Sequence, residues 1–114
     1  MKNNHKTFWR CVECGKPTNV LHEVLFGWNF RQLSIKYNVQ VPICPGDSEC
    51  HRGPHGRNNS LLKGQDYYKM KYLDLLGLDH YQTMINFNCQ LDRNRKYLQE
   101  NKQKGLDYLK SMEI

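Results

Sequence analysis

Four of the five cysteines have a spacing that suits a metal site. Cys11 and Cys14 form a C-x2-C pair, and Cys44 and Cys50 lie further along the chain. Four thiolates suit a tetrahedral zinc ion, and a closed site of this kind is structural. Because five residues separate Cys44 from Cys50, where two are usual, His51 is an alternative fourth ligand. The spacing therefore predicts structural Zn²⁺, with scattered free thiols as the alternative.

Three histidines lie close in sequence to these cysteines. His22 is in a segment predicted to be a strand, His51 directly follows Cys50, and His55 comes four residues after His51. Imidazoles arranged in this way can bind a second divalent metal, or one of them can take a proton from water. The alternative is that they are polar surface groups.

The composition describes a globular chain with a basic bias. The 114 residues suffice for one domain, and 17 basic against 11 acidic residues give a net charge of +6. This charge favours an anionic partner, with nucleic acid first. The chain has neither a long apolar run nor a signal-peptide pattern, so we expect no membrane span and a cytoplasmic location, where thiols stay reduced.

The secondary structure predicted to position these residues changes near residue 60, from strands and loops to helices. Before that point, apolar alternation predicts strands over residues 20–25 and 39–43. Residues 28–38 between them are either a wide loop or a short helical turn. Residues 44–59 are rich in glycine and proline and are predicted to be a loop.

The second half is predicted to be helical. Ser60 caps a first helix that ends at Gly77, and Asp79 caps a second one whose apolar stripe continues to Leu98. Gly105 is expected to break the second helix, and Cys89 is expected within it as a small buried apolar residue. The expected apolar positions of the stripes include Leu75, Met84 and Leu91.

The order of these features resembles the HNH group of nucleases, which share the ββα-metal (His-Me finger) fold. The segments HEV at 22–24, SIKY at 34–37 and VPIC at 41–44 are similar to those of small phage-encoded HNH-like proteins. The resemblance covers residues 11 to about 65. It implies an α+β fold in a single domain, 1–114, with a zinc-bound ββα module over about 8–65 and a helical extension over 66–114.

The resemblance also implies roles for individual residues. His22 stands where the general base lies, and His51 and His55 would hold a catalytic divalent metal such as Mg²⁺. Asn58 is a candidate for the last functional position of the motif. The implied activity is metal-dependent hydrolysis of DNA, in the cytoplasm of a host cell if the protein is phage-encoded.

Two other functions remain open. One is a non-catalytic zinc module that binds nucleic acid, and the other is a zinc-stapled protein that docks a protein partner through its helical half. Both are favoured by Leu21, because the nuclease group usually has a metal ligand at that position.

A nuclease-like module needs basic residues near its site to contact phosphates. The aromatic residues Trp28, Phe30 and Tyr37 interleave with such residues and are predicted either to stack on bases or, with slight preference, to form a small core. The candidates for phosphate contact are Arg31, Lys36, Arg52 and Arg57.

Overall fold

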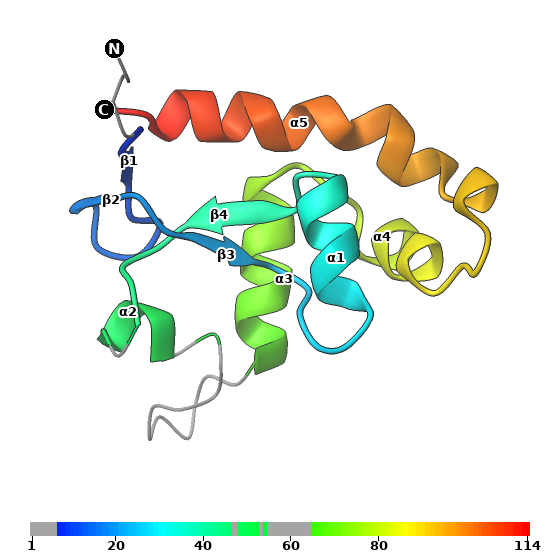
Figure 1. Cartoon of the computed structure of the whole chain (residues 1–114), viewed down its shortest axis with the longest axis horizontal. Coiled ribbons are helices and arrows are strands. Elements are labelled where there is room, and N and C mark those ends of the chain that lie inside the picture. The colour runs from blue at the N-terminus through cyan, green and yellow to red at the C-terminus, as the bar shows by residue number, and fades with distance from the viewer. Residues whose placement is uncertain (1–6, 47, 53, 55–64) are drawn as a thin grey trace, which may run out of the picture.

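The structure is a computed structural model that describes residues 7–46, 48–52, 54 and 65–114. Within this part of the chain, two small antiparallel sheets are combined with helices, and Figure 1 shows the longest helix, α5 (Lys96–Met112), along one edge of the molecule. The α+β class predicted from the sequence is confirmed. No helix in the described ranges is long and apolar enough to cross a bilayer.

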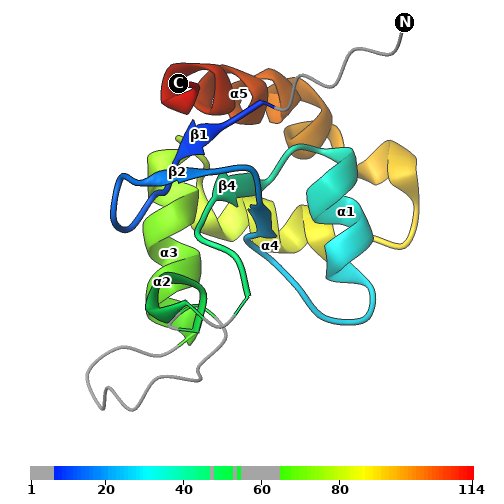
Figure 2. The same cartoon turned by 60° about the vertical axis from the view of Figure 1, so that its left-hand side comes forward.

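The first sheet joins the beginning and the end of the chain. Its strands β1 (Trp9–Arg10) and β2 (Pro17–Thr18) pair in antiparallel fashion, and Trp9 also forms a bridge with Glu113. Figure 2 shows the C-terminus beside β1. Sequence analysis missed this sheet, because strands of two residues carry no alternation that could be detected.

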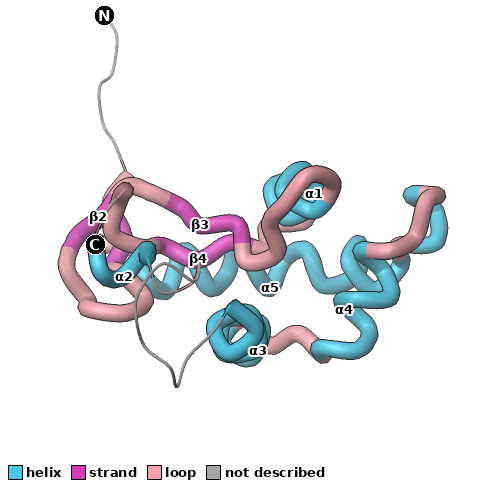
Figure 3. The backbone as a smooth tube through the Cα atoms, turned by 90° about the horizontal axis from the view of Figure 1, so that it is seen from below, coloured by secondary structure: helices cyan, strands magenta, loops and turns pink. Residues whose placement is uncertain are grey.

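The second sheet carries His22. Its strands β3 (Leu21–Glu23) and β4 (Gln40–Pro42) are antiparallel, and His22 lies opposite Val41. The two strands predicted in the first half of the chain are therefore confirmed, although the paired stretches are shorter. Figure 3 views the helix α3 end-on below this pair of strands.

A short helix connects β3 to β4. The segment that could have been a loop or a helical turn forms α1 (Phe30–Lys36). Ser34 is fully buried in this helix, and its hydroxyl donates a hydrogen bond of 2.6 Å to the Leu25 carbonyl. Asn38 then adopts φ +60°, a left-handed conformation that asparagine tolerates, and this turns the chain into β4.

Residues 44–59, predicted to be a loop, contain one helical turn. This is α2 (Glu49–Arg52), and the hydroxyl oxygen of Ser48 accepts a hydrogen bond from the His51 N–H at 3.3 Å. The prediction was wrong for these four residues, because a single turn is too short to give a helical period in sequence.

The structure confirms where the first predicted helix ends and where the second begins. The helix α3 (Gln65–Leu75) is followed by Gly77 at φ +74°, and the carboxylate of Asp79 caps α4 (His80–Phe87) by accepting a backbone N–H at 2.8 Å. Ser60, the predicted cap of the first of them, lies outside the described residues.

The second predicted helix is in fact two. The chain leaves the helix after Phe87, makes the 3-10 turn η1 (Asp92–Asn94), and begins α5 in a new direction. The Asn86 side-chain oxygen accepts hydrogen bonds from the N–H groups of Tyr97 at 3.0 Å and Leu98 at 3.4 Å. A side chain near the end of α4 therefore caps α5, which the sequence pattern did not reveal.

This break changes the surroundings of several apolar residues. Cys89 lies in the connection between α4 and α5, half-buried, with its thiol donating to the Ile85 carbonyl at 3.3 Å, so its predicted place inside a helix was wrong. Three residues assigned to the buried stripes are exposed: Leu75, Met84 and Leu91.

Gly105 lies inside α5 and does not break it. A Cβ atom added at Gly105 would come within 1.9 Å of the Asn38 carbonyl oxygen. The glycine is therefore required by the close approach of α5 to the turn between α1 and β4, and the predicted helix break was wrong. Helix propensity alone could not distinguish these two reasons for a glycine.

One hydrophobic core draws on both halves of the chain. It lies between the β3–β4 pair and helices α1, α3, α4 and α5, so that the cysteine-rich half and the helical half bury one another. Its fully or nearly buried members are Val24, Leu25, Tyr37, Val39, Val41, Tyr68, Tyr72, Leu73, Leu76, Leu78, Phe87 and Leu98.

Gly105→Ala should destabilise the protein. The added methyl group has no room against Asn38, and overpacking of this kind costs about 1–3 kcal/mol. Urea unfolding of the zinc-loaded protein measures the change, with Lys102→Ala on an exposed position of the same helix as the control. If alanine at position 105 left the free energy of unfolding unchanged or raised it, the close approach would be refuted.

Candidate metal centre and adjacent pocket

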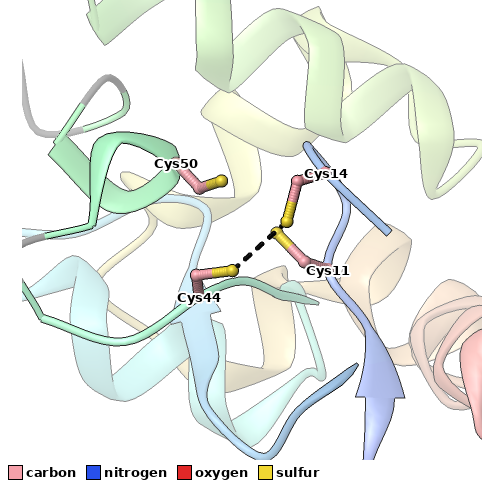
Figure 4. Close-up of side chains that lie close together, drawn as sticks. All are labelled: Cys11, Cys14, Cys44 and Cys50. Atoms are coloured by element: carbon pink, nitrogen blue, oxygen red, sulfur yellow. Dashed lines mark hydrogen bonds between the residues drawn. The ribbon is translucent and has the colours of Figure 1, made fainter. Parts of the chain in front are cut away.

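The four predicted ligands come together from three segments. Cys11 and Cys14 lie in the turn between β1 and β2, Cys44 follows β4, and Cys50 lies in α2, as Figure 4 shows. Their Sγ atoms all lie within 4.8 Å of one another, and those of Cys14 and Cys44 are 3.4 Å apart. The predicted four-cysteine cluster is confirmed.

The geometry of this cluster fits a metal ion. Zinc–sulfur bonds of about 2.3 Å in a tetrahedron put the sulfur atoms roughly 3.8 Å apart. The observed separations bracket that value and exceed by far the ~2.05 Å of a disulfide bond. The cluster can therefore hold a metal ion such as zinc.

The backbone around the first cysteine pair is shaped for this purpose. Gly15 adopts φ +78°, and its N–H donates to the Cys11 carbonyl at 2.9 Å, closing a tight turn. The N–H of Glu13 points at the Cys11 sulfur, 3.4 Å away. Backbone N–H groups directed at sulfur favour the thiolate, which is the form that binds metal.

The thiols differ in acidity when no ion is considered. The backbone N–H of Lys16 and the Cys44 thiol lower the pKa of Cys14 to about 7. Burial, with a contribution from the neighbouring cysteines, raises the pKa of Cys44 to about 11 and raises that of Cys50 as well. Ionisation of Cys44 and Cys50 near neutral pH therefore needs the charge of a bound cation.

The fourth ligand was an open choice between Cys50 and His51. The Cys50 sulfur belongs to the cluster, whereas the His51 ring lies edge-on to the His22 ring, with centroids 5.4 Å apart and an angle of 83°. The geometry favours Cys50, and it leaves His51 next to the other histidine.

Glu13 fastens the cysteine turn to α3. Its carboxylate accepts a hydrogen bond of 2.8 Å from the Tyr72 hydroxyl and forms an ion pair of 2.9 Å with Lys71. Burial and the neighbouring Glu13 raise the pKa of Tyr72 above its usual value. Sequence analysis missed this contact, because nothing local signals a pairing across 59 residues.

His22 lines a pocket next to the cluster. Its side chain is 3% exposed, and its ring contacts those of Phe26 at 5.7 Å and Tyr72 at 5.9 Å between centroids. The pocket has a volume of about 720 Å³ and opens to solvent. It is lined by Val20, Leu21, His22, Glu23, Phe26, Gly27, Trp28, Arg31, Gln32 and His51.

Several predicted site residues cannot be located. His55, Arg57 and Asn58 lie outside the described residues, and so does the side chain of Arg52. The pairing of His51 with His55 around a catalytic metal therefore stays a prediction.

The remaining basic candidates have acidic partners. Arg31 lines the pocket and pairs with Glu23 at 3.1 Å. Lys36 pairs with Asp92 at 2.9 Å, and the Tyr37 hydroxyl donates to the same carboxylate. These two donors, Tyr37 first, lower the pKa of Asp92 to about 2. Lys36 therefore helps to hold α1 against the η1 turn.

Of the three aromatic residues predicted either to stack on bases or to form a small core, two pack in or against the core and one is exposed. Phe30 packs edge-on against Phe87, with centroids 5.4 Å apart, and Tyr37 is buried in the core. Trp28, in contrast, is 95% exposed. The small-core interpretation therefore holds for two of them and fails for Trp28.

Comparisons with protein-family models, with curated proteins and with solved structures give no significant match. The resemblance to HNH nucleases therefore depends on the segments at 22–24, 34–37 and 41–44.

Replacing Cys50 by alanine should abolish metal binding, whereas His51→Ala should preserve it. A structural zinc site of four thiolates loses most of its affinity with one ligand removed, and its binding energy is folding energy. Metal analysis of the purified protein should give about one zinc per chain for wild type and His51→Ala. Loss of zinc in His51→Ala but not in Cys50→Ala would reverse the assignment.

Glu13→Gln should lower the free energy of unfolding by about 1–2 kcal/mol, because it removes a charged acceptor from two hydrogen-bonding partners. Denaturant unfolding of the zinc-loaded protein measures this. Glu100→Gln, on an exposed position of α5, is the control. An equal effect of both substitutions would show that Glu13 contributes nothing specific.

Proposed function

We propose that this protein is a metal-dependent DNA endonuclease of HNH type that uses His22 as a general base and zinc as a structural ion. The observation that carries the proposal is the position of His22 and His51, with ring centroids 5.4 Å apart, on the wall of one pocket beside the cysteine cluster.

Both histidines are held by elements that the cluster fastens. His22 is on β3, which pairs with β4, and Cys44 follows that strand directly. His51 is adjacent to Cys50 in α2. The separation of the two imidazoles therefore follows from metal ligation on either side, which is the arrangement that a preorganised hydrolytic site requires.

The chemistry that fits this pocket is hydrolysis of a phosphodiester. The neutral imidazole of His22 takes a proton from water while the water oxygen bonds to phosphorus. The bond from phosphorus to the leaving oxygen breaks, and that oxygen takes up a proton. A divalent ion such as Mg²⁺, held by His51 and His55, would supply positive charge at the phosphate. Arg31, which lines the pocket, is a candidate for binding a further phosphate oxygen.

The non-catalytic alternatives have their own support. Leu21 lines the pocket at the position where the resemblance calls for a metal ligand, which favours a module that binds nucleic acid without cutting it. A protein partner is favoured by exposed apolar residues of α3, where Tyr67, Met70 and Leu75 line a second pocket of about 450 Å³.

A plasmid-nicking assay with Mg²⁺, Mn²⁺ or Ni²⁺ tests the proposal. His22→Ala should cut about 10²- to 10⁴-fold more slowly than wild type, the usual contribution of a general base. His80→Ala is the matched control, because His80 is engaged by Asp74 at 2.7 Å between α3 and α4 and should leave the rate unchanged. Zinc content is measured for each variant, so that loss of the fold is not mistaken for loss of the base.

The nuclease proposal fails if wild type cuts no faster than His22→Ala with every metal. If the protein then still shifts DNA at low salt, where phosphate binding is strongest, it is a nucleic-acid-binding module. If it does not, a protein partner becomes the leading function.

A further inference from the structure

Trp28 has an unusual position at the rim of the pocket. It lies in the connection between β3 and α1, it is 95% exposed, and it lines the same pocket as His22 and His51. Single exposed apolar residues are common, but an indole with both faces in solvent beside a candidate site offers a large surface for a ligand.

The chain around Trp28 is anchored on both sides. Phe26 packs its ring against His22, and Phe30 packs against Phe87. Between them, Gly27 turns the chain at φ +107°, and its carbonyl accepts the Arg31 N–H at 3.2 Å. Phe26 and Phe30 are thus both partly buried on either side of Trp28, whose own side chain stays in solvent.

The charges near this indole suit an anionic chain. Arg31 is on the pocket wall, and its guanidinium is largely exposed although it pairs with Glu23. Lys69, on α3, lies over the ring of Phe26 with its ammonium 5.1 Å from the centroid. Arg31 therefore lines the pocket that Trp28 borders, Lys69 lies against another of its lining residues, and the whole chain carries +6.

We propose that Trp28 is a stacking platform for an unpaired nucleobase, so that the pocket takes a single-stranded stretch of nucleic acid. The flat face of an indole binds a base of any sequence by stacking, and cations beside it hold the backbone. In an intact duplex the base faces are already stacked on each other and are not available to it. This inference depends on the proposed function only for nucleic acid as the ligand, since stacking does not require cleavage.

Tryptophan fluorescence of the full-length, zinc-loaded protein gives a direct readout. Stacking of a base on Trp28 should quench it when an oligothymidylate of about ten nucleotides is added at low salt. Trp28→Phe removes this signal and leaves Trp9, half-buried on β1, as an internal reference that should not change. A blunt duplex of the same length should give little quenching.

Affinity separates stacking from charge. Trp28→Ala should bind the single strand roughly 5- to 150-fold more weakly, as expected when the stacking of one base is lost. Trp28→Phe, which keeps a ring, should lie between alanine and wild type. Tyr81→Ala, which removes another exposed aromatic ring on α4, is the matched control and should bind as wild type does.

The outcomes distinguish this inference from the nuclease proposal. Quenching with weaker binding of Trp28→Ala supports the platform even if no DNA is cut. Equal binding by Trp28→Ala and wild type overturns it even if plasmid is nicked. The inference is also overturned if Trp28→Ala loses as much affinity for duplex as for single-stranded nucleic acid, because Trp28 would then contribute equally to binding of an intact duplex.

Discussion

The four thiols that meet within 4.8 Å join three segments that contain little regular secondary structure of their own. β1 and β2 contain two residues each, and α2 is a single turn. Elements this short are not stable alone, because the entropy of ordering them exceeds what their few backbone hydrogen bonds return. Shared ligation of one ion by the four thiols would supply part of the missing free energy, and the metal would then act as part of the core of the N-terminal half.

Two routes lead from this cluster to His22. Through Cys50 and α2, it brings His51 to the edge of the His22 ring. Through Glu13, it fastens α3, whose Tyr72 ring contacts His22 from another side. The histidine proposed as the base thus has ring contacts with two residues that are tied to the cysteine cluster, His51 through Cys50 and Tyr72 through Glu13. If the four thiols hold a metal ion, the geometry of this pocket depends on that ion, although the cysteines themselves do not line the pocket.

The opposite wall of the pocket has a different origin. It is formed by the connection from β3 to α1, which is anchored by the buried hydroxyl of Ser34, by the Arg31–Glu23 pair and by the packing of Phe30. The Ser34 and Phe30 contacts belong to the core shared with the helical half, whereas the Arg31–Glu23 pair is partly exposed. The pocket therefore lies between the elements joined by the cysteine cluster and a connection held mainly by core packing, and exposed Trp28 is part of that connection.

The sequence by itself determined features that depend on residues close together in the chain, or on residue types that are known to bind metal. Local rules predicted the C-x2-C turn, the Asp79 cap, the helix end at Gly77 and the strands around His22. The set of four cysteines was predicted because thiolates are common ligands of zinc.

Only the tertiary structure decided which residues meet across long separations. Gly105 packs on Asn38, Asn86 caps α5, Glu13 binds Tyr72, and of three similar aromatic residues Trp28 alone stays in solvent. Each of these depends on the distance between segments far apart in the chain, which no local pattern encodes.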